Sequence, residues 1–461
     1  MIRNLTSFLV LVLLAAGCNT NDNPGGPSGS TALQQFIFVN PLTGSDGNSG
    51  TQDAPVKTIH RALALFKPGI RIELQAGTYN VANGQVFPDS LPSGVVIESV
   101  SAGQAVLVGT IGDIAFYAAG TDTIKYVQFQ GFNTCIRAGS GSHVLLGVGL
   151  TTINKTFDIY GAAEGIFQAG TGTSAVIATA KEFSRITIKD CVLSGGTSNY
   201  SIVTLSNAAR ALITGTTIKD SPTTVLEMYD ATVAEINTST FSNTGLHGLG
   251  SSAAASLRGT ASLTIIGSTI TDTYGSAIAM ESPTAVLTLK RVQLARNAMN
   301  GFGAAALYLY GSASIDSCAI VNNGEYGIVL SQGYFTFRHC DISGAPSQGI
   351  SVSGGASLTM RSSTVSYSGI GVHLVASNSL ADLGTASDPG GNTFRNNTKY
   401  GVQSDVTVNG TAVQAVGNTW IPNVQGADAN GHYTAKAVAG PTTATTHQNY
   451  YITGAGRSIQ F

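Results

Sequence analysis

Charge is scarce in this sequence. Only 10% of its 461 residues are Asp, Glu, Lys or Arg, against roughly 25% in a typical globular domain. No two acidic residues are adjacent, and the formal net charge is −2. Such a chain has no general field that would attract nucleic acid or an anionic membrane. Nucleic acid is therefore not an expected partner, and an acidic polymer would need a local basic patch.

Cysteine and long apolar runs are also rare. The five cysteines have spacings that fit no zinc-ligand pattern. The seven histidines form neither a His-x-His nor a His-Glu-x-x-His arrangement, and the sequence contains no Gly-x-Ser-x-Gly elbow or phosphate-binding loop. No segment beyond the first twenty or so residues approaches the length of a membrane-spanning helix. These absences exclude the common zinc, serine-hydrolase and nucleotide-binding motifs.

Residues 1–17 are typical of an export signal. Arg3 provides a positive start, and the apolar run that follows is too short to cross a bilayer. The run ends in Leu-Ala-Ala-Gly-Cys at 14–18, which resembles the lipobox of bacterial lipoproteins. That resemblance implies cleavage before Cys18 and lipid attachment to Cys18. The alternative is an ordinary signal peptide with a chance cysteine.

Residues 18–31 are predicted to form a flexible tether, because no apolar residue follows Cys18 until Ala32. Asn19 stands after the cysteine, where Asp would favour retention in the inner membrane. We therefore expect an exported, lipid-anchored protein at the outer membrane or cell surface of a Gram-negative bacterium. The lipid anchor would be its only membrane contact.

A repeat of 22 to 29 residues dominates the middle of the chain. Each unit has an apolar anchor, a residue three positions later that is usually small or polar, and a second apolar residue five positions after the anchor. The anchors are Ile188, Ile213, Ile236, Ile265, Leu289, Ile315, Phe337 and Met360. Another short apolar strand follows about thirteen positions after the anchor, for example at 327–330 and 349–352.

This repeat predicts an all-β fold, a coil of short parallel strands that stack about 4.8 Å apart. Helical repeats are excluded because the apolar period is that of strands. The units also lack the leucine-rich frame and are too short for propeller blades. We predict a β-helix of about twelve coils over 101–423 and a C-terminal cap over 424–461, with Trp420 closing the core. At 151–185 the repeat is weak, and an insertion or one irregular coil is expected.

Residues 32–100 are predicted to form an N-terminal cap with the first coils. KTIHRALALF at 57–66 has the apolar spacing of a short amphipathic helix, and Pro68-Gly69 ends it. The run from 36 to 79 resembles the cap of a bacterial family of unknown function in the pectin-lyase-like superfamily of right-handed parallel β-helix proteins. The matching residues are Val39-Asn40-Pro41, Gly44-Ser45-Asp46, Asn48-Ser49-Gly50, Ala54-Pro55, Lys57-Thr58-Ile59, Ala62-Leu63, Gly69, Ile72, Leu74 and Gly77-Thr78-Tyr79. Ile70 departs from the Asp usual in that family. The resemblance implies fold and export, and polysaccharide binding or cleavage only by analogy.

Two ladders of polar residues are candidate sites. Asp220, Asn243 and Asp272 lie seven positions after three consecutive anchors, so stacking would bring them close enough to share a Ca²⁺ ion. The alternative is a ladder of turn residues, because Asp and Asn favour turns. No other cofactor is expected.

The second ladder lies one position after the anchor and comprises Lys290, Asp316, Arg338 and Arg361. It is a candidate contact surface for an acidic sugar, and the alternative is a set of surface ion pairs.

Cys318 and Cys340 occupy equivalent inward positions in adjacent coils. The stacking distance and the oxidising compartment would allow a disulfide between them, and two buried, stacked thiols are the favoured alternative. The Asp46-Gly47-Asn48 loop would either bind a cation or form an Asx-type turn.

Three functions remain open. The first is a surface module that binds polysaccharide or a surface partner without catalysis. The second is a polysaccharide lyase or glycoside hydrolase with a non-standard site, which would need carboxylates from different coils. The third is a purely structural surface protein. The first and third are favoured because carboxylate pairs are missing. Tyr308 and Tyr310 share one face of a strand and would support binding if that face is exposed.

Overall fold

The computed structural model describes residues 35–195, 201–245, 253–299, 305–375, 378–405, 410–421, 450–452 and 457–460. The predicted signal peptide, the tether with Cys18 and most of the predicted C-terminal cap lie outside these ranges. Two short strands of the C-terminal region, β44 and β45, are described. All of the described residues belong to one compact unit, which begins at Gln35.

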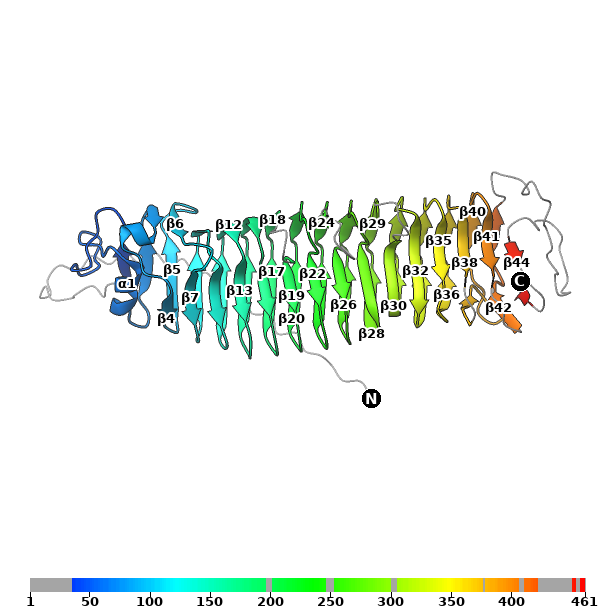
Figure 1. The fold of residues 1–461 in the computed structure, drawn as a ribbon, viewed down its shortest axis with the longest axis horizontal. Coiled ribbons are helices and arrows are strands. Elements are labelled where there is room, and N and C mark those ends of the chain that lie inside the picture. Colours follow the sequence, from blue (N-terminus) through cyan, green and yellow to red (C-terminus); the bar gives the residue numbers. More distant parts are fainter. Residues whose placement is uncertain are drawn as a thin grey trace, which may run out of the picture. The chain divides into compact units, whose positions relative to one another are not determined.

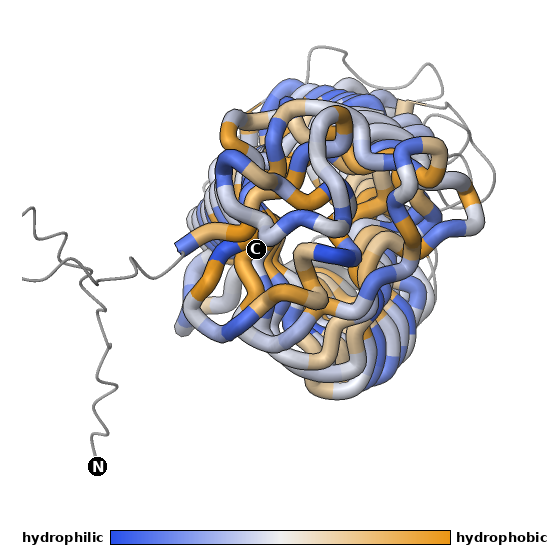
Figure 2. Tube along the Cα trace, turned by 90° about the vertical axis from the view of Figure 1, so that its left-hand side faces the viewer, coloured by the Kyte–Doolittle hydropathy of each residue, from blue (hydrophilic) through white to orange (hydrophobic). Residues whose placement is uncertain are grey.

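This unit is a parallel β-solenoid with three strand faces, in which the coils stack along one axis (Figure 1). A 30-stranded sheet supplies faces 1 and 2, and a 15-stranded sheet supplies face 3. Viewed down the axis, the coils superpose one behind another (Figure 2). The chain passes from face 2 to face 3 and then to face 1 before it begins the next coil.

Face 1 is built from strands that pair in parallel with their counterparts one coil away. They are β4 (Asp89–Leu91), β7 (Ile114–Ala118), β10 (Thr134–Ala138), β13 (Lys155–Ile159), β16 (Ala178–Ala180), β19 (Val203–Leu205), β22 (Leu226–Met228), β25 (Ala255–Leu257), the first parts of β28 (Ile278–Lys290) and β30 (Ala305–Asp316), β32 (Tyr326–Gln332), β35 (Gln348–Val352), β38 (Ile370–Leu374), β41 (Tyr400–Ser404) and β44 (Tyr450–Ile452).

Face 2 carries the anchors of the sequence repeat. Its strands are β1 (Phe36–Val39), β2 (Arg71–Leu74), β5 (Val95–Ser99), β8 (Asp122–Lys125), β11 (Ser142–Leu146), β14 (Glu164–Gln168), β17 (Arg185–Lys189), β20 (Arg210–Thr214), β23 (Val233–Asn237), β26 (Ser262–Ile266), the second parts of β28 and β30, β33 (Tyr334–Arg338), β36 (Ser357–Arg361), β39 (Leu380–Asp382), β42 (Gly410–Gln414) and β45 (Arg457–Gln460).

Face 3 carries the second apolar position of the repeat. Its strands are β3 (Gly77–Tyr79), β6 (Ala105–Val108), β9 (Gln128–Gln130), β12 (Gly149–Ile153), β15 (Thr171–Ala175), β18 (Val192–Ser194), β21 (Thr217–Lys219), β24 (Thr240–Ser242), β27 (Thr269–Thr271), β29 (Gln293–Ala295), β31 (Ala319–Val321), β34 (Asp341–Ser343), β37 (Thr364–Ser366), β40 (Thr393–Arg395) and β43 (Thr419–Ile421).

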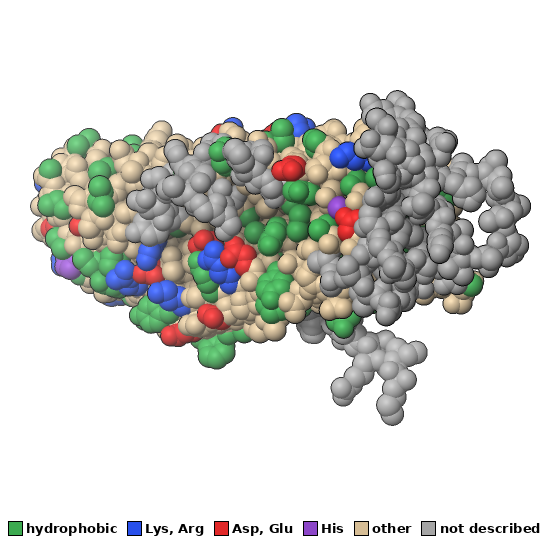
Figure 3. All heavy atoms as spheres, turned by 45° about the vertical axis from the view of Figure 1, so that its right-hand side comes forward, with side chains coloured by type: hydrophobic (Ala, Val, Ile, Leu, Met, Phe, Trp, Pro, Cys, Tyr) green, Lys and Arg blue, Asp and Glu red, His purple; other side chains and the backbone are tan. Residues whose placement is uncertain are grey.

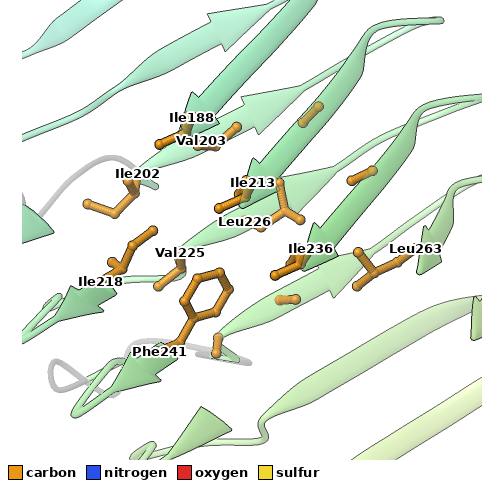
Figure 4. Close-up of a cluster of buried hydrophobic side chains, with 14 of the residues drawn as sticks. Ile188, Ile202, Val203, Ile213, Ile218, Val225, Leu226, Ile236, Phe241 and Leu263 are labelled. Atoms are coloured by element: carbon orange, nitrogen blue, oxygen red, sulfur yellow. The ribbon is translucent and has the colours of Figure 1, made fainter. Parts of the chain in front are cut away.

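The predicted anchors form one continuous ladder inside the coil. The eight residues from Ile188 to Met360 are register partners on consecutive strands of face 2. All eight are essentially fully buried, and Ile188, Ile213 and Ile236 follow one another into the same interior (Figure 4). Because each buried Ile or Leu contributes roughly 1.5 to 3 kcal/mol, this stacking is the main source of stability. The prediction of a parallel β-helix is confirmed.

The bends between faces explain the polar positions of the repeat. The residue two positions after an anchor has a positive φ, as at Asp190 and His339, and so does the residue seven positions after it in most coils, as at Asp220 and Asn243. A left-handed residue turns the chain from one flat strand to the next. Glycine, asparagine and aspartate tolerate that conformation better than other residues.

The weak stretch at 151–185 belongs to regular coils, with the strands β13 to β16 in place, so the expected insertion or irregularity there is wrong. Its strands pair in register with those before and after, for example Leu150 with Gly172 and Gly172 with Leu193. The repeat was hidden because Gly172 stands where other coils have a large apolar residue. The solenoid also has more coils between 101 and 423 than the predicted twelve, since fourteen described strands of face 3, from β6 to β43, lie in that range.

The two ends differ in how they close the core. At the N-terminal end, helix α1 (Ile59–Leu65) lies where it was predicted, and Ile59 and Ala62 are buried. A single 3-10 turn, η1 (Val81–Asn83), follows. The Asp46 carboxylate is bound by groups at the start of α1. It accepts hydrogen bonds from the backbone N–H groups of Lys57 and Thr58 and from the Thr58 hydroxyl, at 2.9 to 3.0 Å.

At the other end, Trp420 stacks on Phe394 with ring centroids 4.5 Å apart. The two residues are register partners on β43 and β40. Trp420 thus continues the apolar ladder of face 3 in the last described coil of that face, and its closing of the core stays a prediction.

Candidate functional site

The predicted calcium ladder lies at the bend between faces 3 and 1. The Asn243 amide donates to Asp220 Oδ1 at 2.7 Å. Arg296, one coil beyond Asp272, donates to both carboxylate oxygens of Asp272, at 2.6 and 2.8 Å. These hydrogen bonds lower the pKa of Asp272. A cation would have to displace Arg296, so the three residues do not fit a Ca²⁺ site and form a ladder of bend residues.

The predicted basic ladder is in register, as expected, but its members differ. Lys290 pairs with Asp316, Asp316 with Arg338, and Arg338 with Arg361 on consecutive strands. Lys290 and Arg338 are exposed, and Asp316 accepts a hydrogen bond from His339 at 3.0 Å.

Arg361 is not a surface contact, contrary to the prediction. Only 7% of its side chain is exposed. Its guanidinium binds Asp388 at 2.8 Å and Asp382 at 2.9 Å, and donates to the carbonyls of Met360 and Asp382. Arg361 therefore holds the loop between β39 and β40, residues 383–392, against the coil, and its guanidinium is unavailable to a ligand.

No disulfide joins Cys318 and Cys340, which are free, buried thiols. Each thiol lies within hydrogen-bond distance of the carbonyl two residues before it, at 3.3 and 3.1 Å. Residues stacked in register have parallel Cα–Cβ bonds about 4.8 Å apart, whereas a disulfide draws its Cβ atoms to about 3.8 Å. The strand spacing explains why stacking alone does not produce a disulfide.

A hydrogen-bonded polar network, missed in the sequence, lies on face 1. We call it the tyrosine–arginine network; it comprises Glu227, Tyr229, Arg258 and Glu281. Arg258 Nη1 donates to Tyr229 Oη at 2.9 Å. Arg258 Nε and Nη2 donate to the two carboxylate oxygens of Glu281, at 3.0 and 3.4 Å. Its guanidinium also lies 5.2 Å from the centre of the Tyr229 ring.

The electrostatics of the network follow from these contacts. The pKa of Tyr229 is raised first by burial and then by the negative charge of Glu227, to which its hydroxyl is hydrogen-bonded. The pKa of Arg258 is raised chiefly by its hydrogen bonds to Glu281. The guanidinium is thus fixed in place and charged, with a carboxylate on either side.

Aromatic residues continue the same face beyond the network. Glu227, Ser256, Ala279 and Tyr308 are register partners on β22, β25, β28 and β30. Tyr308 is 41% exposed, and Tyr310 pairs with Glu281. Figure 3 shows that acidic and basic side chains lie side by side on one face of the molecule, next to hydrophobic side chains. Tyrosine rings beside fixed charged groups can stack on a sugar ring and bind its hydroxyls.

This network could hardly be predicted from the sequence. Its four residues belong to three coils, and none lies in a recognisable motif. The one available signal was Tyr308 and Tyr310, whose spacing places them on one face and whose exposure the structure confirms for Tyr308.

A histidine–aspartate pair lies further along face 1. His373 Nε2 is 2.7 Å from Asp405 Oδ2, and Gln403 Nε2 donates to both oxygens of Asp405. His373 pairs with Ser351 one coil before it. His373 is 8% exposed, and its Nδ1 has no hydrogen-bond partner among the described residues. The pair is held firmly but is closed to a large ligand.

A second histidine–aspartate pair is fully buried. His143 Nδ1 lies 2.6 Å from Asp122 Oδ2, and His143 Nε2 lies 2.9 Å from the Ser140 carbonyl. Burial raises the pKa of Asp122. Burial lowers the pKa of His143, but the hydrogen bond and charge of Asp122 outweigh it, so that pKa is raised as well.

Stability is expected to fall as the pH rises because of this buried pair. Both folded-state pKa values lie above the unfolded ones, so the folded chain binds more protons. The Asp122 contribution is lost above about pH 3.8, and the His143 contribution is lost as the pH rises beyond about 6.5 and through the raised folded value. The measurement is the thermal midpoint from pH 5 to 9. The double variant Asp122→Asn, His143→Gln is expected to show a flatter profile, and an unchanged slope would contradict this assignment.

Neither a metal cluster nor a membrane helix appears in the described ranges. No group of three or more His, Cys, Asp or Glu side chains there could hold a metal ion. No helix there is long and apolar enough to cross a membrane.

Comparison with protein families agrees with the coil geometry. Residues 42–142 match a family described as "Protein of unknown function (DUF1565)". Residues 283–440 match the family "Right handed beta helix region". The parallel strand pairing along the whole described coil agrees with this match, and the fold is a parallel β-helix. None of the curated proteins matches the sequence.

Solved structures resemble this β-helix in fold only. Pectate lyase Pel9A is 16% identical, with 86% of this chain and 82% of that chain covered and a TM-score of 0.27. Tailspike protein 3 of bacteriophage CBA120 is 13% identical, with 85% and 60% covered and a TM-score of 0.41. The catalytic unit of a GH87 α-1,3-glucanase from Streptomyces thermodiastaticus is 14% identical, with 87% and 65% covered and a TM-score of 0.39. Similarity this distant carries no argument about function.

Proposed function

We propose that the protein is an exported lipoprotein that binds polysaccharide on face 1 of its β-helix without cleaving it. The observation behind this proposal is the exposed Tyr308, which stands on a flat sheet beside the tyrosine–arginine network. Aromatic rings supply contact area for sugar faces, and fixed charged groups supply hydrogen bonds to hydroxyls. A rigid parallel sheet holds both without loss of entropy on binding.

Binding is favoured over cleavage because of how the carboxylates are engaged. A glycoside hydrolase needs one carboxyl group that can donate a proton. Both carboxylate oxygens of Glu281 accept hydrogen bonds from Arg258, so this carboxyl group is engaged with the protein itself. A lyase or hydrolase, and a purely structural role, remain the alternatives that the experiment separates.

The test is retention of the purified chain on a panel of insoluble polysaccharides, with the release of reducing ends and unsaturated products followed alongside. We expect retention without products. Tyr308→Ala is expected to weaken binding about tenfold or more, the effect of losing a central aromatic contact. The matched control is Tyr334→Ala, a more exposed tyrosine on face 2, which should bind like the wild type. Product formation would favour an enzyme, and no retention on any polysaccharide would favour a structural protein.

The lipid anchor is proposed from the sequence at 14–18. Metabolic labelling with a fatty-acid analogue should mark the wild-type chain and not Cys18→Ser. Equal labelling of both chains would refute Cys18 as the lipid site.

A further inference from the structure

The tyrosine–arginine network contains more negative than positive groups. Arg258 is the only cation among its four residues, and its two-point ion pair is with Glu281. Glu227, by contrast, forms no direct ion pair with Arg258 or with another described residue. Its hydrogen-bond partner in the network is the neutral hydroxyl of Tyr229, and the Arg258 guanidinium acts on it only through its charge. Two carboxylates and one guanidinium leave a net charge of −1 around Glu227.

This excess negative charge argues against an acidic ligand. A uronic-acid polymer would bring further carboxylates to a surface whose one nearby guanidinium is already bound on two sides. Like charges without a free cation disfavour binding. A positively charged group, by contrast, would complete the network by pairing with Glu227.

We propose that face 1 recognises a polysaccharide that carries free amino groups, with Glu227 as the residue that selects the protonated amine. This inference rests on the proposed polysaccharide binding and specifies its ligand. The sugar ring stacks on Tyr308, and an ammonium group of the same chain pairs with the Glu227 carboxylate.

The spacing of the two residues suits a linear polymer. Glu227 and Tyr308 occupy one register row and are separated by three strand spacings, or roughly 14 Å at about 4.8 Å each. The residues between them in the row, Ser256 and Ala279, have small side chains, and the Ser256 hydroxyl lies 3.4 Å from Glu281 Oε1. A chain of several sugar units that runs along the solenoid axis can therefore meet both residues at once.

The test compares two soluble oligosaccharides that differ only in the amine: β-1,4-linked oligomers of glucosamine and of N-acetylglucosamine of equal length. Binding to the full chain is measured by calorimetry at about pH 6, where a primary amine is protonated, at low and high salt. The glucosamine oligomer is expected to bind more tightly, and salt should weaken its binding selectively.

Variants assign the selectivity to Glu227. Glu227→Gln is expected to weaken binding of the glucosamine oligomer about threefold to fivefold, the range of a partly exposed ion pair, and to leave the acetylated oligomer unaffected. The matched control is Glu235→Gln. Glu235 is an exposed carboxylate on face 2 that accepts a hydrogen bond from Asn237, and this change should have no effect on either ligand.

The outcomes separate this inference from the function on which it rests. Equal affinity for the two oligomers, or an unchanged preference in Glu227→Gln, would overturn the amine selectivity and leave polysaccharide binding in place. Loss of all polysaccharide binding by the wild type would overturn both. A preference for acidic polysaccharides in the panel would also contradict the inference.

Discussion

Replacement of Phe337 by alanine is expected to lower the free energy of unfolding by about 3 to 4 kcal/mol. Phe337 is fully buried in the anchor ladder of face 2, between Ile315 in the preceding coil and Met360 in the next. Alanine would remove the ring from both stacking contacts and leave a cavity that flat, hydrogen-bonded strands cannot close. The loss therefore includes the transfer of the ring and the cost of the void.

The control for this change is Thr336→Ala in the same strand. Thr336 is adjacent in sequence but points away from the core and is partly exposed, so less than about 1 kcal/mol is expected. Chemical denaturation monitored by circular dichroism measures both variants. If the two substitutions cost the same, the inward and outward assignment of β33 is wrong.

Replacement of Arg361 by alanine is expected to cost about 2 to 3 kcal/mol. Removing one partner of a fully buried ion pair costs about 3 to 5 kcal/mol, but here Asp382 and Asp388 are 36% and 65% exposed, so solvent compensates part of the loss. The variant would leave the carbonyls of Met360 and Asp382 without their donor. We expect the loop between β39 and β40 to open more readily than the rest of the coil.

Arg338→Ala is the matched control, because Arg338 occupies the same ladder one coil earlier. Its side chain is exposed, and a cost within about 0.5 kcal/mol is expected. Hydrogen exchange over residues 380–392 should increase in Arg361→Ala and stay unchanged in Arg338→Ala. Equal exchange in both variants would refute the fastening role of Arg361.

The contrast between these two arginines shows what the repeat could and could not predict. Their shared register was predictable, because residues at equal distances from two anchors stack on neighbouring strands. Their environments were not predictable, because Arg361 is buried by the loop between β39 and β40, which brings Asp388 close to Asp382 and the coil. The length and path of such a loop do not follow from the repeat.

At the bends between faces, too, the positions were predictable but the side-chain partners were not. The turn interpretation of Asp220, Asn243 and Asp272 was weighed from sequence, and the structure supports it through their positive φ angles. What sequence could not supply was the partner Arg296, which fills the place of a cation at Asp272. Stacking brings like positions together in every coil, but the hydrogen bonds among them depend on side-chain direction.

The sequence by itself determined the solenoid, its faces and the inward ladder, because burial of a fixed apolar period along parallel strands has one geometric solution. It also determined the short helix at the N-terminal end. Only the tertiary structure assembled Glu227, Tyr229, Arg258 and Glu281, which lie on three coils and share no motif. Residues that point outward do not pack in the core, so their types need not repeat from coil to coil. Their grouping into a site therefore appears only when the coils are stacked.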